Sequence, residues 1–185
     1  VFAPSSARAR QKNVRPVGSR SAIWMLVRPP SPCGIPPRLN MIELNGASTR
    51  VALANGVFDA QTSGTITAWV KPKTVALASV ISAIGTDWFA FSLEQSGARY
   101  RPRVQCNCAG VGNVVVANNY FTADAWHHVA VTSTGSTWKL YTDGIEQGLT
   151  VSTGTNNGKW FDDAGGTVSY ELGRRVGGAG DDAFD

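Results

Sequence analysis

The sequence predicts an all-β protein built as an antiparallel β-sandwich. Short runs rich in β-branched and aromatic residues recur from Met41 onward. Glycine, asparagine, aspartate, serine or proline separates most of these runs, and no segment keeps a helical period over a useful length. Many short strands with turn signals between them are typical of sandwiches and jelly rolls. A chain of 185 residues suits one such domain plus a tail.

The first forty residues are expected to be a separate segment. Residues 1–40 are rich in arginine, serine and proline, carry seven cations and no acid, and show no sustained periodicity. This composition predicts a disordered segment or an extended linker. Of the 17 Lys and Arg residues, ten remain in 41–185 against all 13 acids, a net charge of −3. The basic character therefore belongs to the tail, and no nucleic-acid partner is expected.

Alternation of apolar and polar residues places the strands. They are expected near 42–44, 50–53, 65–71, 79–84, 88–94, 99–106, 113–117, 126–132, 138–142, 145–151 and 167–172. The strongest pair is 126–132 and 138–142, because turn residues lie between them and Asp143-Gly144 follows with the chemistry of a tight hairpin. With 145–151 as the returning strand, these segments predict a three-stranded antiparallel meander.

Four motifs in this order resemble the laminin G-like jelly roll domains of the concanavalin A-like lectin/glucanase superfamily. They are I-E-L-N-G from Ile42, T-I-T-A-W-V-K-P from Thr65, W-H-H-V-A-V-T from Trp126 with a later L-Y-x-D-G, and L-G-R from Leu172. The resemblance covers about Met41 to Asp185 and implies a jelly roll. In that family a motif like G-x-I-D-E-V-R-I-Y forms a terminal strand. The sequence stops at Asp185 before it, so we expect a domain that is incomplete at its C-terminus and lacks the final strand.

The resemblance implies a non-catalytic carbohydrate- or protein-binding or adhesion module. Its partners would be a glycan or an extracellular protein, and it would sit beside other domains of a larger extracellular or cell-surface chain. One alternative is a structural spacer attached to a secreted enzyme, and another is a glycoside hydrolase of the same superfamily. The hydrolase is disfavoured because its chemistry needs paired carboxylates roughly 5–10 Å apart, whereas the glutamates are isolated from other acids. No apolar run approaches the ~20 residues that cross a membrane.

Two groups of side chains are candidates for ligand contacts. Trp160 stands in a polar loop with Asn157 and Asp162, where an aromatic platform beside hydrogen-bonding groups suits sugar recognition. The alternative for Trp160 is a loop aromatic folded back onto the core. The second group is Arg99, Arg101 and Arg103, which alternate along one strand. They would line one face and could hold carboxylate or sulfate groups of an acidic glycan, or they form an ordinary solvated face.

The other tryptophans of the strands are expected to belong to the core. Trp69, Trp126 and Trp138 all lie within predicted strands. His127 and His128 are neighbours on a strand and point to opposite faces, so they cannot easily share one ion. We expect both histidines to serve packing or hydrogen bonding within the sandwich.

Calcium is the one candidate cofactor. Residues 177–185 form a glycine-rich loop that carries Asp181, Asp182 and Asp185 and matches the nonapeptide G-G-x-G-x-D-x-U-x once. Carboxylates and exposed carbonyls in a flexible loop are the ligands that Ca²⁺ prefers. By resemblance, laminin G-like modules often hold calcium at a loop rim. The alternative is a solvated loop without metal.

Three cysteines leave at least one thiol unpaired within the chain. Cys106 and Cys108 would point the same way on a strand, and a disulfide between them would be strained. We expect free thiols, with a bridge from Cys33 to one of the pair as the alternative. Suitably spaced Cys or His partners for a zinc site do not follow.

Overall fold

A computed structural model describes residues 23–27, 40–44, 50–73, 77–166 and 168–173. The elements in chain order are β1 (Ile23–Val27), β2 (Asn40–Leu44), β3 (Val51–Leu53), β4 (Gly64–Val70), β5 (Leu77–Ile84), β6 (Trp88–Ser96), β7 (Arg99–Cys108), β8 (Val111–Ala117), β9 (Phe121–Thr122), β10 (His127–Ser133), β11 (Trp138–Thr142), β12 (Ile145–Glu146), β13 (Leu149–Thr153), the 3₁₀ turn η1 (Phe161–Ala164) and β14 (Ser169–Leu172). The described strands pair in antiparallel fashion, as alternating sequences with tight turns require.

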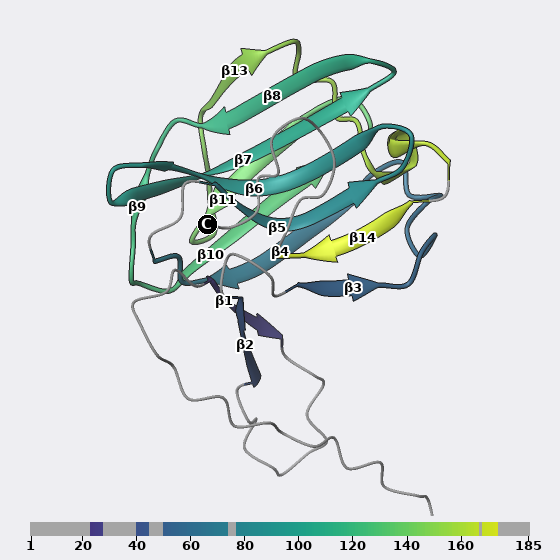
Figure 1. Ribbon diagram of the computed structural model, residues 1–185. Helices are drawn as coiled ribbons and strands as arrows, with labels where there is room; N and C mark the ends of the chain where they lie inside the picture. The colour runs from purple at the N-terminus through teal and green to yellow at the C-terminus, as the bar shows by residue number, and fades with distance from the viewer. Residues whose placement is uncertain (1–22, 28–39, 45–49, 74–76, 167, 174–185) are drawn as a thin grey trace, which may run out of the picture.

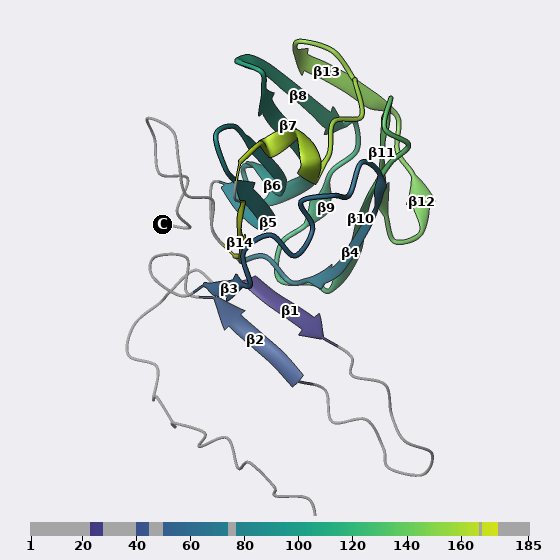
Figure 2. The ribbon, with the colours of Figure 1, turned by 90° about the vertical axis from the view of Figure 1, so that its right-hand side faces the viewer.

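The strands form two sheets that lie face to face (Figure 1). Sheet A has six strands in the order β12-β11-β10-β4-β1-β2. Sheet B has eight strands in the order β13-β8-β7-β6-β5-β14-β3, with β9 paired to β7. Figure 2 shows the two layers edge-on, with η1 between them at one end. The predicted all-β antiparallel sandwich is confirmed. The expected absence of a final strand concerns the chain end, which lies outside the described residues.

The core lies between the sheets because each strand turns alternate side chains inward. In β6 of sheet B, Phe89, Phe91 and Leu93 are fully buried, and in β10 of sheet A so are Val129 and Val131. These inward rows belong to one contiguous apolar cluster. Burial of apolar area at about 25 cal/mol per Å² is the main favourable term for such a fold.

An aromatic cluster closes one end of the core. Trp160 and Phe161, at the start of η1, contact Phe89 of β6 at ring-centroid distances of 5.1 and 5.3 Å. Phe58 and Tyr170 complete the cluster at 5.3 and 5.4 Å from Phe161. Edge-to-face and tilted pairs of this kind add to area burial. The cluster holds η1 between the sheets.

The predicted returning strand 145–151 divides into two strands of different sheets. β12 pairs with β11 in sheet A, whereas β13 pairs with β8 in sheet B. The chain crosses between the sheets at Gln147 and Gly148. There Gln147 N donates to Leu140 O at 2.9 Å, and Asn118 N donates to Gly148 O at 2.8 Å. The predicted meander is therefore wrong after its first hairpin and the short β12.

The expected boundary at residue 40 does not coincide with the edge of sheet A. Ile23–Val27 forms β1, which pairs with β2 along its whole length and with β4 at Met25–Val70. For these five residues the expectation of a disordered linker is wrong, because an apolar run beside the edge of β4 can complete backbone hydrogen bonds there. The rest of residues 1–40 except Asn40 lies outside the described part.

Cys106 and Cys108 are joined by a disulfide on β7. Both side chains point to the same side of the strand, as predicted, and on that side both are buried. Their Cα atoms lie 5.6 Å apart, inside the range that a disulfide bridges. The expectation of free thiols is therefore wrong for this pair, and Cys33 lies outside the described residues.

Candidate functional site

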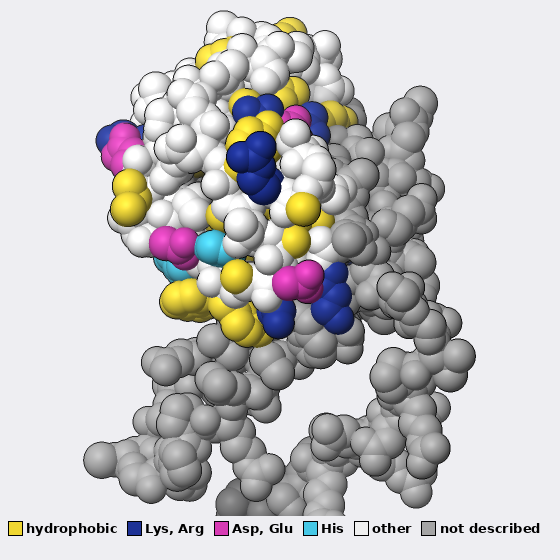
Figure 3. Space-filling model, turned by 90° about the vertical axis from the view of Figure 1, so that its left-hand side faces the viewer, with side chains coloured by type: hydrophobic (Ala, Val, Ile, Leu, Met, Phe, Trp, Pro, Cys, Tyr) yellow, Lys and Arg dark blue, Asp and Glu magenta, His cyan; other side chains and the backbone are white. Residues whose placement is uncertain are grey.

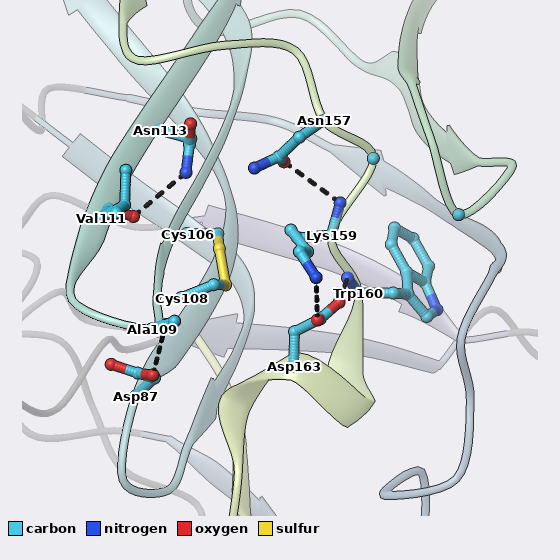
Figure 4. Close-up of polar contacts among 12 residues, drawn as sticks. Asp87, Cys106, Cys108, Ala109, Val111, Asn113, Asn157, Lys159, Trp160 and Asp163 are labelled. Carbon is cyan, nitrogen blue, oxygen red and sulfur yellow. Dashed lines mark hydrogen bonds and ion pairs between the residues drawn. A yellow bond between two sulfur atoms is a disulfide. The ribbon is translucent and has the colours of Figure 1, made fainter.

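The predicted ligand residues lie at two separate places on sheet B. Arg99, Arg101 and Arg103 occupy the first half of β7. Asn157, Trp160 and Asp162 belong to the loop between β13 and β14, and this loop lies beside Cys106 and Cys108 in the second half of β7 (Figure 4). The fold does not bring the two groups together. Asp181, Asp182 and Asp185 lie outside the described residues, so the predicted calcium site stays a prediction.

Trp160 is buried and does not form an exposed platform. Only 2% of its surface is accessible, and its ring packs on Phe89 and Phe161. Gly158 allows this path because its φ is +66° and an added Cβ would lie 2.2 Å from Thr137 N. The alternative of a loop aromatic folded back onto the core is the arrangement found, and the predicted stacking role of Trp160 is wrong for this conformation.

The polar groups of this loop mostly bind one another (Figure 4). Asn157 Oδ1 accepts from Lys159 N at 3.3 Å, and Lys159 Nζ lies 2.6 Å from Asp163 Oδ1. Asp163 Oδ2 also accepts from Trp160 N at 2.9 Å. The carboxylate of Asp163 raises the pKa of Lys159. These bonds shape the loop and leave few groups for a ligand.

Asp162 is the exposed one of the three predicted ligand residues in this loop. Partial burial, followed by repulsion from Asp163, raises the pKa of the Asp162 carboxyl. A raised pKa means that no cation of the protein neutralises this group fully. Asp162 therefore remains a candidate for contact with a ligand donor, as the sequence predicts.

Three arginines line the outer face of sheet B. Tyr100 and Val104 of β7 are buried in the core, so Arg99, Arg101 and Arg103 point to the opposite side. The stripe predicted from alternation is thus where the strand period places it. The same face continues into Gln105, which is 2% exposed and whose Nε2 has no hydrogen-bond partner within the part of the chain that the structure describes.

Tyr120 and Glu94 hold the first two arginines in place. The Arg101 guanidinium lies 4.8 Å and that of Arg99 5.7 Å from the ring centroid of Tyr120. Arg101 Nε also donates to Glu94 Oε2 at 2.5 Å. Figure 3 views the side of the molecule where β9 lies, and there Lys and Arg side chains gather beside hydrophobic ones. We call Arg99, Arg101, Arg103, Glu94 and Tyr120 the arginine cluster.

Sequence reasoning did not place Tyr120 beside the arginines, although it is part of this cluster. Tyr120 precedes β9, a strand that pairs with the start of β7. The signal that could have found it is the short aromatic pair Tyr120-Phe121. One ring of this pair would be expected inside the sandwich and the other outside.

The two histidines serve separate sides of sheet A, as predicted. His127 points inward, 4.4 Å from the Phe121 ring, and its Nδ1 lies 2.8 Å from Asp143 Oδ2. His128 lies on the outer face, 5.4 Å from the ring of Trp69. Over the described ranges, no group of three or more His, Cys, Asp or Glu side chains comes together as a metal site.

Several carboxylates bind donors of the protein itself. Asp143 pairs with His127, Glu94 with Arg101, Glu146 with Lys139, Glu171 with Arg50, Asp163 with Lys159 and Asp59 with Tyr170.

A model of the concanavalin A-like lectin/glucanases superfamily, of laminin G-like type, matches residues 45–185. A search of curated proteins found no match. Within the described residues, no helix has the length and apolar character that a membrane crossing needs.

Proposed function

Because the chain belongs to the laminin G-like domains of the concanavalin A-like lectin/glucanases superfamily, we propose that it is a non-catalytic binding module for an acidic glycan. The observation that carries this proposal is the arginine cluster on the outer face of sheet B. Membership of the superfamily supports a binding module in general. The acidic ligand, the extracellular setting within a larger protein and the absence of catalysis are parts of the proposal.

The geometry of the arginine cluster suits an extended polyanion. Alternate residues of a strand lie about 6.6 Å apart, so Arg99 to Arg103 span about 13 Å. Each guanidinium presents a planar fork of donors that matches a carboxylate or sulfate. Glu94 neutralises Arg101 in part, whereas Arg99 is exposed and held only against Tyr120 among the contacts found. A row of fixed cations recognises a chain of anions better than a single one.

The test is retention on an immobilised sulfated or uronic-acid polysaccharide. The variant Arg99→Gln should elute at lower salt and bind about fivefold more weakly, because one exposed ionic contact contributes about 1 kcal/mol. Lys139→Gln is the matched control, since Lys139 is an exposed cation on sheet A already paired with Glu146 at 3.1 Å. It should behave like the wild type.

Three outcomes would contradict the proposal. Equal losses in both variants would show non-specific charge attraction. If the wild-type chain binds none of the acidic and neutral polymers, the result would favour the structural spacer. Release of sugar from the polymer by the purified chain, abolished by a glutamate substitution, would establish a hydrolase.

A further inference from the structure

The outer face of sheet A carries exposed aromatic side chains that packing does not require. Register places Trp69 of β4 beside His128 of β10, with a ring-centroid distance of 5.4 Å. Trp69 is 44% exposed, and Trp126, two residues before His128, is 37% exposed. The expectation that these two tryptophans belong to the core is therefore wrong. β4 lies inside the sheet, between β10 and β1, so Trp69 is not simply a residue at a free edge.

Small side chains surround these rings. Ala130 follows His128 on the same face of β10 and pairs with Tyr141 of β11 on one side and Thr67 of β4 on the other. Ala130 is buried because its side chain is short and the longer side chains of Tyr141 and Thr67 lie on either side of it. We call these residues the Trp69 face: Thr65, Thr67, Trp69, His128, Ala130, Thr132, Lys139 and Tyr141. Aromatic rings and threonine hydroxyls surround the small, buried side chain of Ala130 on this face.

The single cation of the Trp69 face is balanced by Glu146 of the neighbouring strand β12. This cation, Lys139, lies 3.1 Å from Glu146 Oε2, and Tyr141 Oη donates to the same oxygen at 3.3 Å. The hydrogen bond to Glu146 and its charge raise the pKa of Lys139. The contrast with the arginine cluster on sheet B is plain, because no surplus of cations is left here to attract a polyanion.

We propose that the Trp69 face binds a neutral polysaccharide by stacking a pyranose ring on Trp69. A pyranose ring has an apolar C–H face and a rim of hydroxyls. The indole of Trp69 suits the first, and the imidazole of His128 and nearby threonine hydroxyls suit the second. A partner protein would favour a larger continuous apolar patch. This surface lies on the other sheet from the arginine cluster and goes beyond the function proposed for that cluster.

The experiment is affinity electrophoresis of the whole chain in gels containing xyloglucan, mixed-linkage β-glucan or galactomannan. At least one of these neutral polymers should retard the wild type, and Trp69→Ala should weaken binding at least tenfold. Trp69→Tyr, which keeps an aromatic ring and replaces the indole N–H donor by an O–H donor, should retain most of the retardation. Val151→Ala removes another exposed apolar side chain, 45% exposed on β13 of sheet B, and should change nothing.

The outcomes separate this proposal from the previous one. Arg99→Gln should leave neutral-polymer binding intact, and Trp69→Ala should leave acidic-polymer binding intact. Retardation unchanged in folded Trp69→Ala, or a wild type that none of the three polymers retards, would overturn the proposal. So would a wild-type dimer in sedimentation velocity that Trp69→Ala converts to monomer without any sugar effect, because the face would then serve self-association. If circular dichroism shows Trp69→Ala to be unfolded, His128→Ala and Trp69→Tyr decide the question.

Discussion

Asp143 lies in the turn between β11 and β12 and bonds the end of β11 to the start of β10. Its Oδ1 accepts from His128 N at 2.8 Å, its Oδ2 pairs with His127 Nδ1 at 2.8 Å, and its own N donates to His128 O at 2.7 Å. Asp143 has a φ of +51°, which aspartate tolerates better than most residues. The Asp143-Gly144 turn therefore reverses the chain direction, and the Asp143 carboxylate also binds His127 and the backbone of His128.

The acid sensitivity of the fold is predicted to depend on Asp143. Burial would raise the pKa of its carboxyl, but the hydrogen bonds from His127 and His128 and the attraction of both imidazoles outweigh it and lower the pKa below 3.8. A lowered folded pKa contributes stability above the unfolded value, and this contribution is lost as the pH falls through the folded pKa. Asp143→Asn should cost about 1 kcal/mol at pH 7 and lose less stability than the wild type on acidification below about pH 4.

Urea unfolding at pH 7, 5 and 3.5 measures this difference. Asp162→Asn is the matched control, because the pKa of Asp162 is raised rather than lowered. Its removal should leave stability at pH 7 equal or slightly higher, the opposite sign. Parallel curves for the wild type and Asp143→Asn at all three pH values would contradict the assigned role of Asp143.

Among the elements, β1 decides whether β4 has a neighbour on its outer side. β4 pairs with β10 over its full length, Gly64 to Val70, but with β1 only at Val70–Met25. The β1–β2 hairpin leaves the body of the sandwich at the lower side of Figure 2. β1 therefore protects only one end of β4, and an edge without it would be prone to pair with other chains.

Met25→Pro is predicted to open this edge. Proline has no N–H and disrupts a paired strand, so β1 should separate from β4. The amides of β4 should then exchange faster with deuterium, and the protein should scatter more light on heating. Val27→Pro, at the strand end opposite Asn40, is the control and should have a smaller effect. Equal exchange of β4 in wild type and Met25→Pro would show that β1 does not protect this edge.

For the whole molecule, the two candidate surfaces lie on the outer faces of different sheets. The arginine cluster lies on sheet B and the Trp69 face on sheet A, and one contiguous core separates them. A sandwich has two such faces because only the inward-pointing side chains of each strand form the core, and the alternate side chains point outward. One chain could thus hold an acidic and a neutral polymer independently.

Calcium binding by Asp181, Asp182 and Asp185 is a prediction about the stability of the whole domain. The loop follows β14, which lies between β5 and β3 in sheet B. An ion that binds only the folded state stabilises it by mass action. With a Kd of about 10⁻⁴ to 10⁻³ M, 10 mM Ca²⁺ should add about 1.4–2.7 kcal/mol.

Thermal unfolding measures the calcium effect. The Tm should rise with Ca²⁺, return with EDTA and stay unchanged when Mg²⁺ is added instead. The variant Asp181→Asn/Asp182→Asn should lose the rise. If Ca²⁺ does not change the Tm, or if the rise in Tm persists in this variant, the result would support a solvated loop.

The strand period by itself determined which side of each strand a residue faces. Alternation puts Val129 and Val131 on the same side of β10, which is the buried side, and the disulfide-linked Cys106 and Cys108 on the same side of β7. It also placed Arg99, Arg101 and Arg103 on the opposite side of that strand. These features depend on local backbone geometry alone, so a single sequence contains them.

Only the tertiary structure decided what lies over each side. Trp160, in a polar loop, is buried because η1 enters between the sheets, whereas Trp69, in an alternating strand, is exposed because its side of sheet A faces outward. The crossing at Gln147 and Gly148 and the addition of β1 to β4 likewise depend on distant partners. Burial is a property of two segments that meet, and alternation along one segment does not specify its partner.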